Sequence, residues 1–92
     1  PRERTEAVVI FRALSAAEKL VRDGVSDAGE VKSRVREIIG QCGIAVIDYV
    51  EITDPDEMTP APEITGNSLL VVAVRIGGAR LIDNIILSPP KG

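Results

Sequence analysis

The sequence contains no histidine and no tryptophan, and it has a single cysteine, Cys42. Without an imidazole, a Ser–His or Cys–His nucleophile pair cannot form, and one cysteine alone cannot build a zinc site. A single cysteine also excludes an internal disulfide framework and fits a reducing compartment. We interpret Cys42 as a small apolar side chain near a helix end. The residue inventory therefore excludes a His-activated Ser or Cys nucleophile and a protein-built zinc site in this chain.

Aromatic side chains and an excess of positive charge are also missing. Phe11 and Tyr49 are the only aromatic residues, so the core must be built from Val, Ile, Leu and Ala. Eleven basic and 14 acidic residues give a net charge of −3, which disfavours nucleic acid as a direct partner. The apolar runs are too short to span a membrane, and no secretory signal is present, so we expect a cytoplasmic location.

The length of 92 residues, 45% of them hydrophobic, is enough for one domain with one core. The spacing of apolar residues predicts a first helix over residues 3–23, followed by Gly24 at its C-terminal end. Its predicted buried stripe consists of Ala7, Ile10, Phe11, Leu14, Ala17 and Val21. A second helix is predicted over residues 27–39, capped by Asp27 with Glu30 as its capping-box partner. Its buried stripe is Val31, Val35, Ile38, Ile39 and Cys42.

The second half of the chain is rich in β-branched residues and predicts three strands, over residues 45–54, 69–76 and 80–87. Residues 54–65 contain three prolines and predict a loop, in which DPDEM could form one helical turn. Gly77 and Gly78 lead into a strand rather than a helix, which favours a hairpin turn over a phosphate-binding loop. The fold class is therefore α+β, with two N-terminal helices packed on a small three-stranded antiparallel sheet (α-α-β-β-β).

Two acidic residues stand at otherwise apolar positions of the predicted strands. Period-two alternation places Asp48 on one face with Val46, Val50 and Ile52, and it places Asp83 on one face with Leu81, Ile85 and Leu87. Unpaired buried carboxylates are disfavoured, and Arg75 and Arg80 are the available cations. Either these groups line a ligand site, or they form an ion-paired end of the sheet.

Three segments of the sequence resemble a known family. They are DYVEITDP at residues 48–55, LLVVAVRIGGARLIDNI at residues 69–85, and Arg12-Ala13-Leu14-Ser15 within the first helix. In order and spacing they are similar to the C-terminal domain of the pantothenate synthetase (pantoate–β-alanine ligase) family, over essentially the whole chain. Gly78 stands where members often have a polar or cationic residue, which weakens any role for a basic turn side chain.

The resemblance implies that residues 1–92 are one domain of a two-domain, homodimeric, AMP-forming ligase. Such enzymes use ATP and Mg²⁺ to join pantoate and β-alanine through a pantoyl-adenylate, giving pantothenate, AMP and pyrophosphate. Their N-terminal Rossmann-like domain carries a His-x-Gly-His motif and most of the substrate pocket, and a Ser-Ser-Arg-Asn motif near the domain junction contacts ATP. None of these motifs is present in this sequence. No catalytic or metal-binding residue can therefore be assigned, and we expect no bound cofactor and no activity from the chain alone. The absence of an initiator methionine before Pro1 is also expected of such a segment.

In this family the C-terminal domain is a hinged lid over the active-site cleft. The resemblance thus implies that the chain's partner is the N-terminal domain of its own enzyme. Our candidates for the interdomain lid face are Arg75, Arg80, Asp83 and Asn84, which could instead stabilise the sheet. An alternative function is an interaction or dimerisation module, with a partner bound to the sheet or to an apolar helix face.

Overall fold

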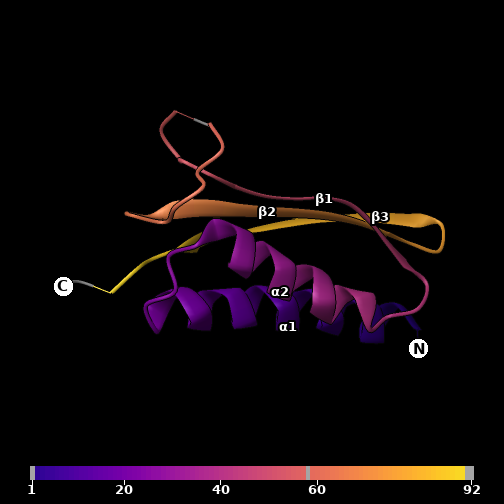
Figure 1. Ribbon diagram of the computed structural model, residues 1–92. Helices are drawn as coiled ribbons and strands as arrows, with labels where there is room; N and C mark the ends of the chain where they lie inside the picture. The colour runs from indigo at the N-terminus through magenta and orange to yellow at the C-terminus, as the bar shows by residue number, and fades with distance from the viewer. Residues whose placement is uncertain (1, 58, 91–92) are drawn as a thin grey trace.

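Two helices lie side by side on one face of a three-stranded antiparallel sheet (Figure 1). The computed structural model describes residues 2–57 and 59–90, and the side chains of residues 8–57 and 59–90. The elements are α1 (Arg2–Arg22), α2 (Ala28–Gly40), β1 (Ala45–Thr53), β2 (Ser68–Ile76) and β3 (Ala79–Leu87). The predicted α+β class and the order α-α-β-β-β are confirmed, with boundaries within one residue of those predicted.

The helix α1 buries Ile10, Leu14, Ala17 and Val21, as the apolar spacing predicted. It ends at Arg22, and Gly24 follows in the turn with a φ of 107°, a conformation that glycine adopts with little strain. The prediction that Phe11 belongs to the buried stripe was wrong, because its side chain is 69% exposed. Successive residues are turned by about 100° around a helix, which places Phe11 to the side of the stripe that contains Ile10. The side chain of Ala7 lies outside the described residues.

The helix α2 begins at the predicted cap. The carboxylate of Asp27 accepts a hydrogen bond from the backbone N–H of Gly29 at 2.9 Å. Among the described residues, Glu30 makes no hydrogen bond back to Asp27, so the capping-box half of the prediction is not seen. The predicted stripe is buried: Val31, Val35, Ile38 and Ile39 lie in the core, and Cys42 packs against it.

The sheet has the order β1-β2-β3, so β2 is its central strand. A two-residue turn, Gly77–Gly78, joins β2 to β3, and Ile76 pairs with Ala79 across it. Gly77 has a φ of 61°, whereas Gly78 is not in the positive region. A positive φ at the first turn residue alone is the pattern of a type II′ hairpin turn, which matches the twist of the strands. The predicted hairpin is confirmed.

The predicted alternation of β1 was wrong at Asp48. The register between β1 and β2 shifts between Ile47 and Tyr49, which makes Asp48 the extra residue of a β-bulge. Beyond the bulge, Val50 and Ile52 face the helices and are buried. Before the bulge, Ala45 and Ile47 pack on the core, whereas Val46 is 53% exposed. One inserted residue thus moves Val46 and Asp48 off the buried face.

The loop between β1 and β2 is fastened to the turn between the helices. Asp27 and Glu63 form an isolated antiparallel bridge, in which the N–H of Ile64 donates to the carbonyl of Ser26 at 2.7 Å. Within the loop, the carboxylate of Asp54 accepts hydrogen bonds from the N–H groups of Asp56 and Glu57. The predicted loop is confirmed, and Met58 of the DPDEM segment lies outside the described residues. In the described part of the chain, neither helix has the length and apolar character needed to cross a bilayer.

Candidate functional site

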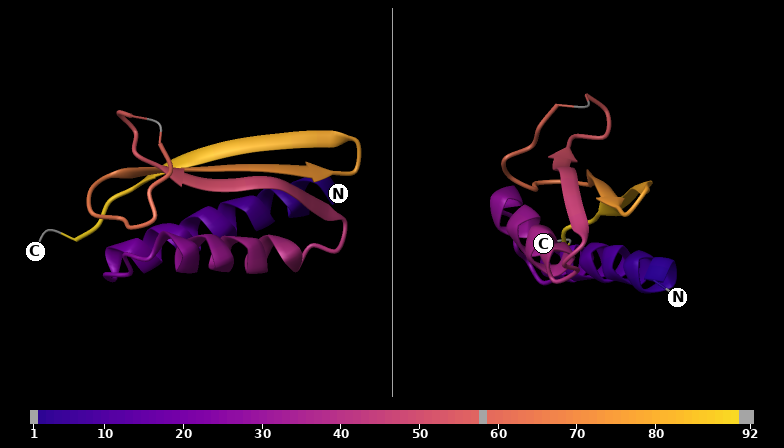
Figure 2. Two further views of the ribbon diagram at one scale, coloured as in Figure 1. Left: turned by 45° about the horizontal axis from the view of Figure 1, so that its top comes forward. Right: turned by 90° about the vertical axis from the view of Figure 1, so that its right-hand side faces the viewer.

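Both helices cover the same face of the sheet, and we call the opposite, helix-free side the open face (Figure 2). Ala73 is fully buried on this face and lies between Tyr49 and Ile82 in the register of the strands. Large hydrophobic side chains nevertheless remain exposed there: Val46 (53%), Tyr49 (37%), Ile82 (57%) and Ile86 (45%). An apolar sheet face of this kind, not covered by a helix, is characteristic of a surface that contacts another molecule or domain.

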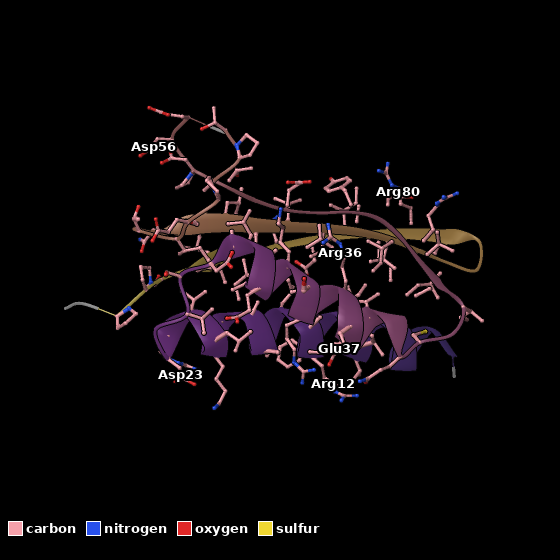
Figure 3. All side chains as sticks on the ribbon, in the orientation of Figure 1. Arg12, Asp23, Arg36, Glu37, Asp56 and Arg80 are labelled. Carbon is pink, nitrogen blue, oxygen red and sulfur yellow. The ribbon has the colours of Figure 1, made fainter. Side chains whose placement is uncertain are left out.

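Three charged side chains meet on the open face near the β2–β3 turn, and we call them the arginine cluster: Asp48, Arg75 and Arg80. Arg75 on β2 pairs directly with Arg80 on β3. The Nε of Arg75 donates to Oδ1 of Asp48 at 2.9 Å, and the Nε of Arg80 donates to Oδ2 at 3.2 Å. Figure 3 shows Arg80 on the side of the sheet away from the helices.

The bulge is what makes the arginine cluster possible. In regular pairing, strict alternation would turn the Asp48 side chain toward the helices with Val50 and Ile52. The extra residue instead leaves its carboxylate on the open face, within hydrogen-bond distance of both guanidinium groups. The two arginine side chains are 60% and 54% exposed, whereas the side chain of Asp48 is 21% exposed.

The four candidate residues predicted from the sequence do not all gather in one place. Asp48 brings Arg75 and Arg80 together through two ion pairs. This arrangement agrees with the sequence interpretation of an ion-paired end of the sheet. Asn84 lies on the open face, separated from Arg80 by the row of Ile82. Asp83 pairs with Val72, a core residue, and therefore lies on the helix-facing side. It is exposed because β3 is an edge strand, and its carboxylate accepts a hydrogen bond from the N–H of Asn84 at 2.8 Å.

Sequence reasoning missed the apolar part of the open face. Tyr49 and Ile82 belong to strands that carry apolar residues on both faces, so alternation did not show which side would be left uncovered. The predicted placement of Val46 on one face with Val50 and Ile52 failed because of the bulge. No sequence signal distinguishes a β-bulge within a run of apolar and acidic residues such as AVIDYVEIT.

Other parts of the described structure offer little chemistry. Among the side chains of residues 8–57 and 59–90, no group of three or more acidic, Cys or His residues is placed to hold a metal ion. A shallow hollow of about 350 Å³ is lined by Ser26, Asp27, Pro62 and Glu63. It lies where the two loops are bridged, and the carboxylate of Asp27 there already caps α2. The open face with its arginine cluster is therefore the candidate functional surface.

Comparison with known proteins identifies the family to which this fold belongs. A family model described as pantoate-beta-alanine ligase matches residues 1–86. The chain belongs to the pantoate–β-alanine ligase family.

Two curated relatives from this family show how much of a member the chain represents. It is 43% identical to a pantothenate synthetase of Geobacillus kaustophilus over 91 residues, which are 99% of this chain and 30% of the relative. It is 37% identical to a pantothenate synthetase of Syntrophomonas wolfei over 87 residues, which are 95% of this chain and 31% of the relative. The chain thus spans about a third of the length of these members of the pantoate–β-alanine ligase family.

The fold agrees with a solved member of the family. The crystal structure of pantothenate synthetase from Thermus thermophilus superposes with a TM-score of 0.86 at 30% sequence identity. The superposition covers 97% of this chain and 32% of the Thermus chain. Both the sequence comparison and the structural comparison therefore match nearly the whole of this chain to about one third of a family member.

Proposed function

We propose that this chain is the C-terminal lid domain of a ligase that joins pantoate and β-alanine. The reaction would consume MgATP, form a pantoyl-adenylate, and release pantothenate, AMP and pyrophosphate. Membership of the family and the coverage of about one third of its members support this assignment. The remaining two thirds of the enzyme would supply the nucleotide-binding motifs, the substrate pocket and the contacts of a homodimer.

The open face is the observation that carries the lid assignment. Val46, Tyr49, Ile82 and Ile86 are exposed on a face that no helix of the chain covers. The part of its relatives that this chain does not match is about twice as long as the chain, and a segment of that kind in the parent enzyme would be the occupant of this face. Closure of an apolar face over the cleft would exclude water from the reactive acyl-adenylate, which would otherwise hydrolyse.

The chain alone would not catalyse the reaction. It has no histidine, and its described residues include no cluster of ligands suited to Mg²⁺. We therefore assign no step involving Mg²⁺ to residues of this chain. When the 92-residue chain is supplied with pantoate, β-alanine and MgATP, we expect no release of pyrophosphate. Turnover by the chain alone would contradict the proposal.

The lid role can be tested in the parent enzyme through the coupling of AMP release to pantothenate formation. Ile82→Asp places a charge on the open face and should prevent tight closure. We expect AMP release to exceed pantothenate formation, because water then reaches the adenylate. Val8→Asp is the matched control: Val8 is 51% exposed on α1, comparable with 57% for Ile82, but it does not lie on the open face.

Equal release of AMP and pantothenate in both variants, at the unaltered rate, would exclude the open face as the lid surface. Melting temperatures of both variants would show whether either substitution acts only by unfolding the domain. The alternative function, a dimerisation module, makes a different prediction. The isolated chain would then self-associate in sedimentation experiments, Ile82→Asp would abolish that association, and the parent enzyme would keep its full rate.

A further inference from the structure

The arginine cluster carries an unbalanced positive charge. Arg75 and Arg80 lie directly opposite each other, a placement that destabilises a sheet when the charges are alike. Asp48 neutralises only one of the two charges, in a chain whose net charge is −3. Local arrangements that oppose stability in this way are concentrated at functional sites.

The way in which the two guanidinium groups are held leaves their outer ends available. Both described hydrogen bonds to Asp48 start from Nε, one to each carboxylate oxygen. In the described part of the chain, no hydrogen bond joins a terminal Nη of either arginine to another residue. The paired Nη groups of arginine match the geometry of phosphate oxygens, with which they form charge-assisted hydrogen bonds.

The surroundings of the cluster leave room for an anion and do not repel it. Gly77 and Gly78 form the adjacent turn, and a Cβ added to either would meet no atom within 4 Å. Of the described carboxylates on the neighbouring strands, Glu51 pairs with Val71, four residues along β2 from Arg75, and forms an ion pair with Lys32 at 3.9 Å. Asp83 lies on the helix-facing side of the sheet. The cluster is therefore the positively charged end of the open face.

We propose that Arg75 and Arg80, positioned by Asp48, form a binding site for a phosphate or pyrophosphate group. Asp48 would act as a positioning residue, because it holds each guanidinium by Nε and directs the Nη groups outward. The assignment of this anion to a nucleotide or its pyrophosphate product rests on the proposed ligase function, whereas the site itself rests on the geometry of the cluster. The start of α1 lies at the same end of the molecule as the β2–β3 turn, but on the helix-covered side of the sheet, so α1 does not cover this site (Figures 1 and 2).

The test is an NMR titration of the 92-residue chain with inorganic pyrophosphate, with acetate as a parallel arm. We expect saturable shifts confined to Asp48, the β2–β3 turn and the two arginine side chains, with a Kd on the order of 1 mM for this exposed site. Acetate should bind at least about tenfold more weakly, because it carries less charge and offers fewer oxygens. Equal binding of acetate would overturn the phosphate assignment in favour of a carboxylate ligand. An absence of saturable shifts would overturn the site altogether.

Three variants separate a built site from general charge attraction. Arg80→Gln should weaken pyrophosphate binding about fivefold or more, whereas Arg36→Gln, an equal loss of charge on an exposed position of α2, should not. Equal weakening by both would overturn the proposal. Asp48→Asn raises the local positive charge and removes the positioning carboxylate. Weaker binding in Asp48→Asn would support the positioning role, and tighter binding would refute it.

These measurements do not depend on the lid function. Binding by the isolated chain together with normal adenylate coupling in the Ile82→Asp parent enzyme would leave the anion site standing and reject the lid. If the isolated chain did not bind pyrophosphate, but the Ile82→Asp parent enzyme released more AMP than pantothenate, the lid function would stand and the anion site would be rejected.

Discussion

Arg75 and Arg80 face each other across β2 and β3, and both donate to the carboxylate of one residue, Asp48. The two cations are therefore held together by an anion from a third strand. The contact joins residues 27 and 32 positions apart in the sequence. It links all three strands at one end of the sheet.

Asp48→Asn should destabilise the chain because the like charges of Arg75 and Arg80 then oppose each other without a counter-charge. We expect a loss of about 1 kcal/mol in the free energy of unfolding, measured by urea denaturation at low salt. The loss should shrink at about 1 M NaCl, where exposed charges are screened. In the double variant Asp48→Asn/Arg80→Gln the loss should be smaller than the sum of the single losses. Simple additivity would show that the ion pairs do not interact energetically.

The difference between the two faces of the sheet predicts opposite responses to truncation in the isolated chain. Ile39 is fully buried beneath the sheet, and Ile39→Ala should reduce the free energy of unfolding by about 2–5 kcal/mol. Ile82 is 57% exposed on the open face, so Ile82→Ala should change the free energy of unfolding by less than about 0.5 kcal/mol. Urea unfolding of both variants provides the measurement. A large loss for Ile82→Ala would mean that the open face is covered in the isolated chain.

The β2–β3 turn requires glycine at its first position for a conformational reason. Gly77 has a φ of 61°, and Gly77→Ala should destabilise the chain by about 1 kcal/mol although the added methyl group meets no neighbour. Gly78 has equal space around it but no positive φ, so Gly78→Ala is the matched control and should have a smaller effect. Thermal unfolding followed by circular dichroism would compare the two. Equal losses would contradict the type II′ assignment.

A substitution at Thr53 should stabilise the chain. Its Oγ1 is buried and has no hydrogen-bond partner among the described residues. Thr53→Val removes this unpaired hydroxyl at nearly constant shape and should raise the free energy of unfolding by about 1 kcal/mol. Thr65→Val, in an exposed part of the β1–β2 loop, should give no gain. A loss in Thr53→Val would indicate that the hydroxyl is hydrogen-bonded in solution.

The parts of the fold that depend on neighbouring residues were predicted well from the sequence. Asp27 capped α2, Gly24 ended the turn after α1, and the Gly77–Gly78 pair formed the hairpin. Each of these features is decided within a few residues of chain, by a side-chain oxygen near a helix N-terminus or by the freedom of glycine at positive φ. The alternation of β2 and β3 also held, because both strands are regular and pair without a shift.

The sequence by itself determined the two helices, the three strands and the aliphatic core. Only the tertiary structure decided that Phe11 is exposed, that Asp48 forms a bulge and joins both arginines, and that an apolar face carrying Tyr49 and Ile82 stays uncovered. The physical reason is that periodicity fixes which residues share a face but not what packs against that face. The position of a bulge depends on pairing with a distant strand, and the exposure of a face depends on where the helices come to lie.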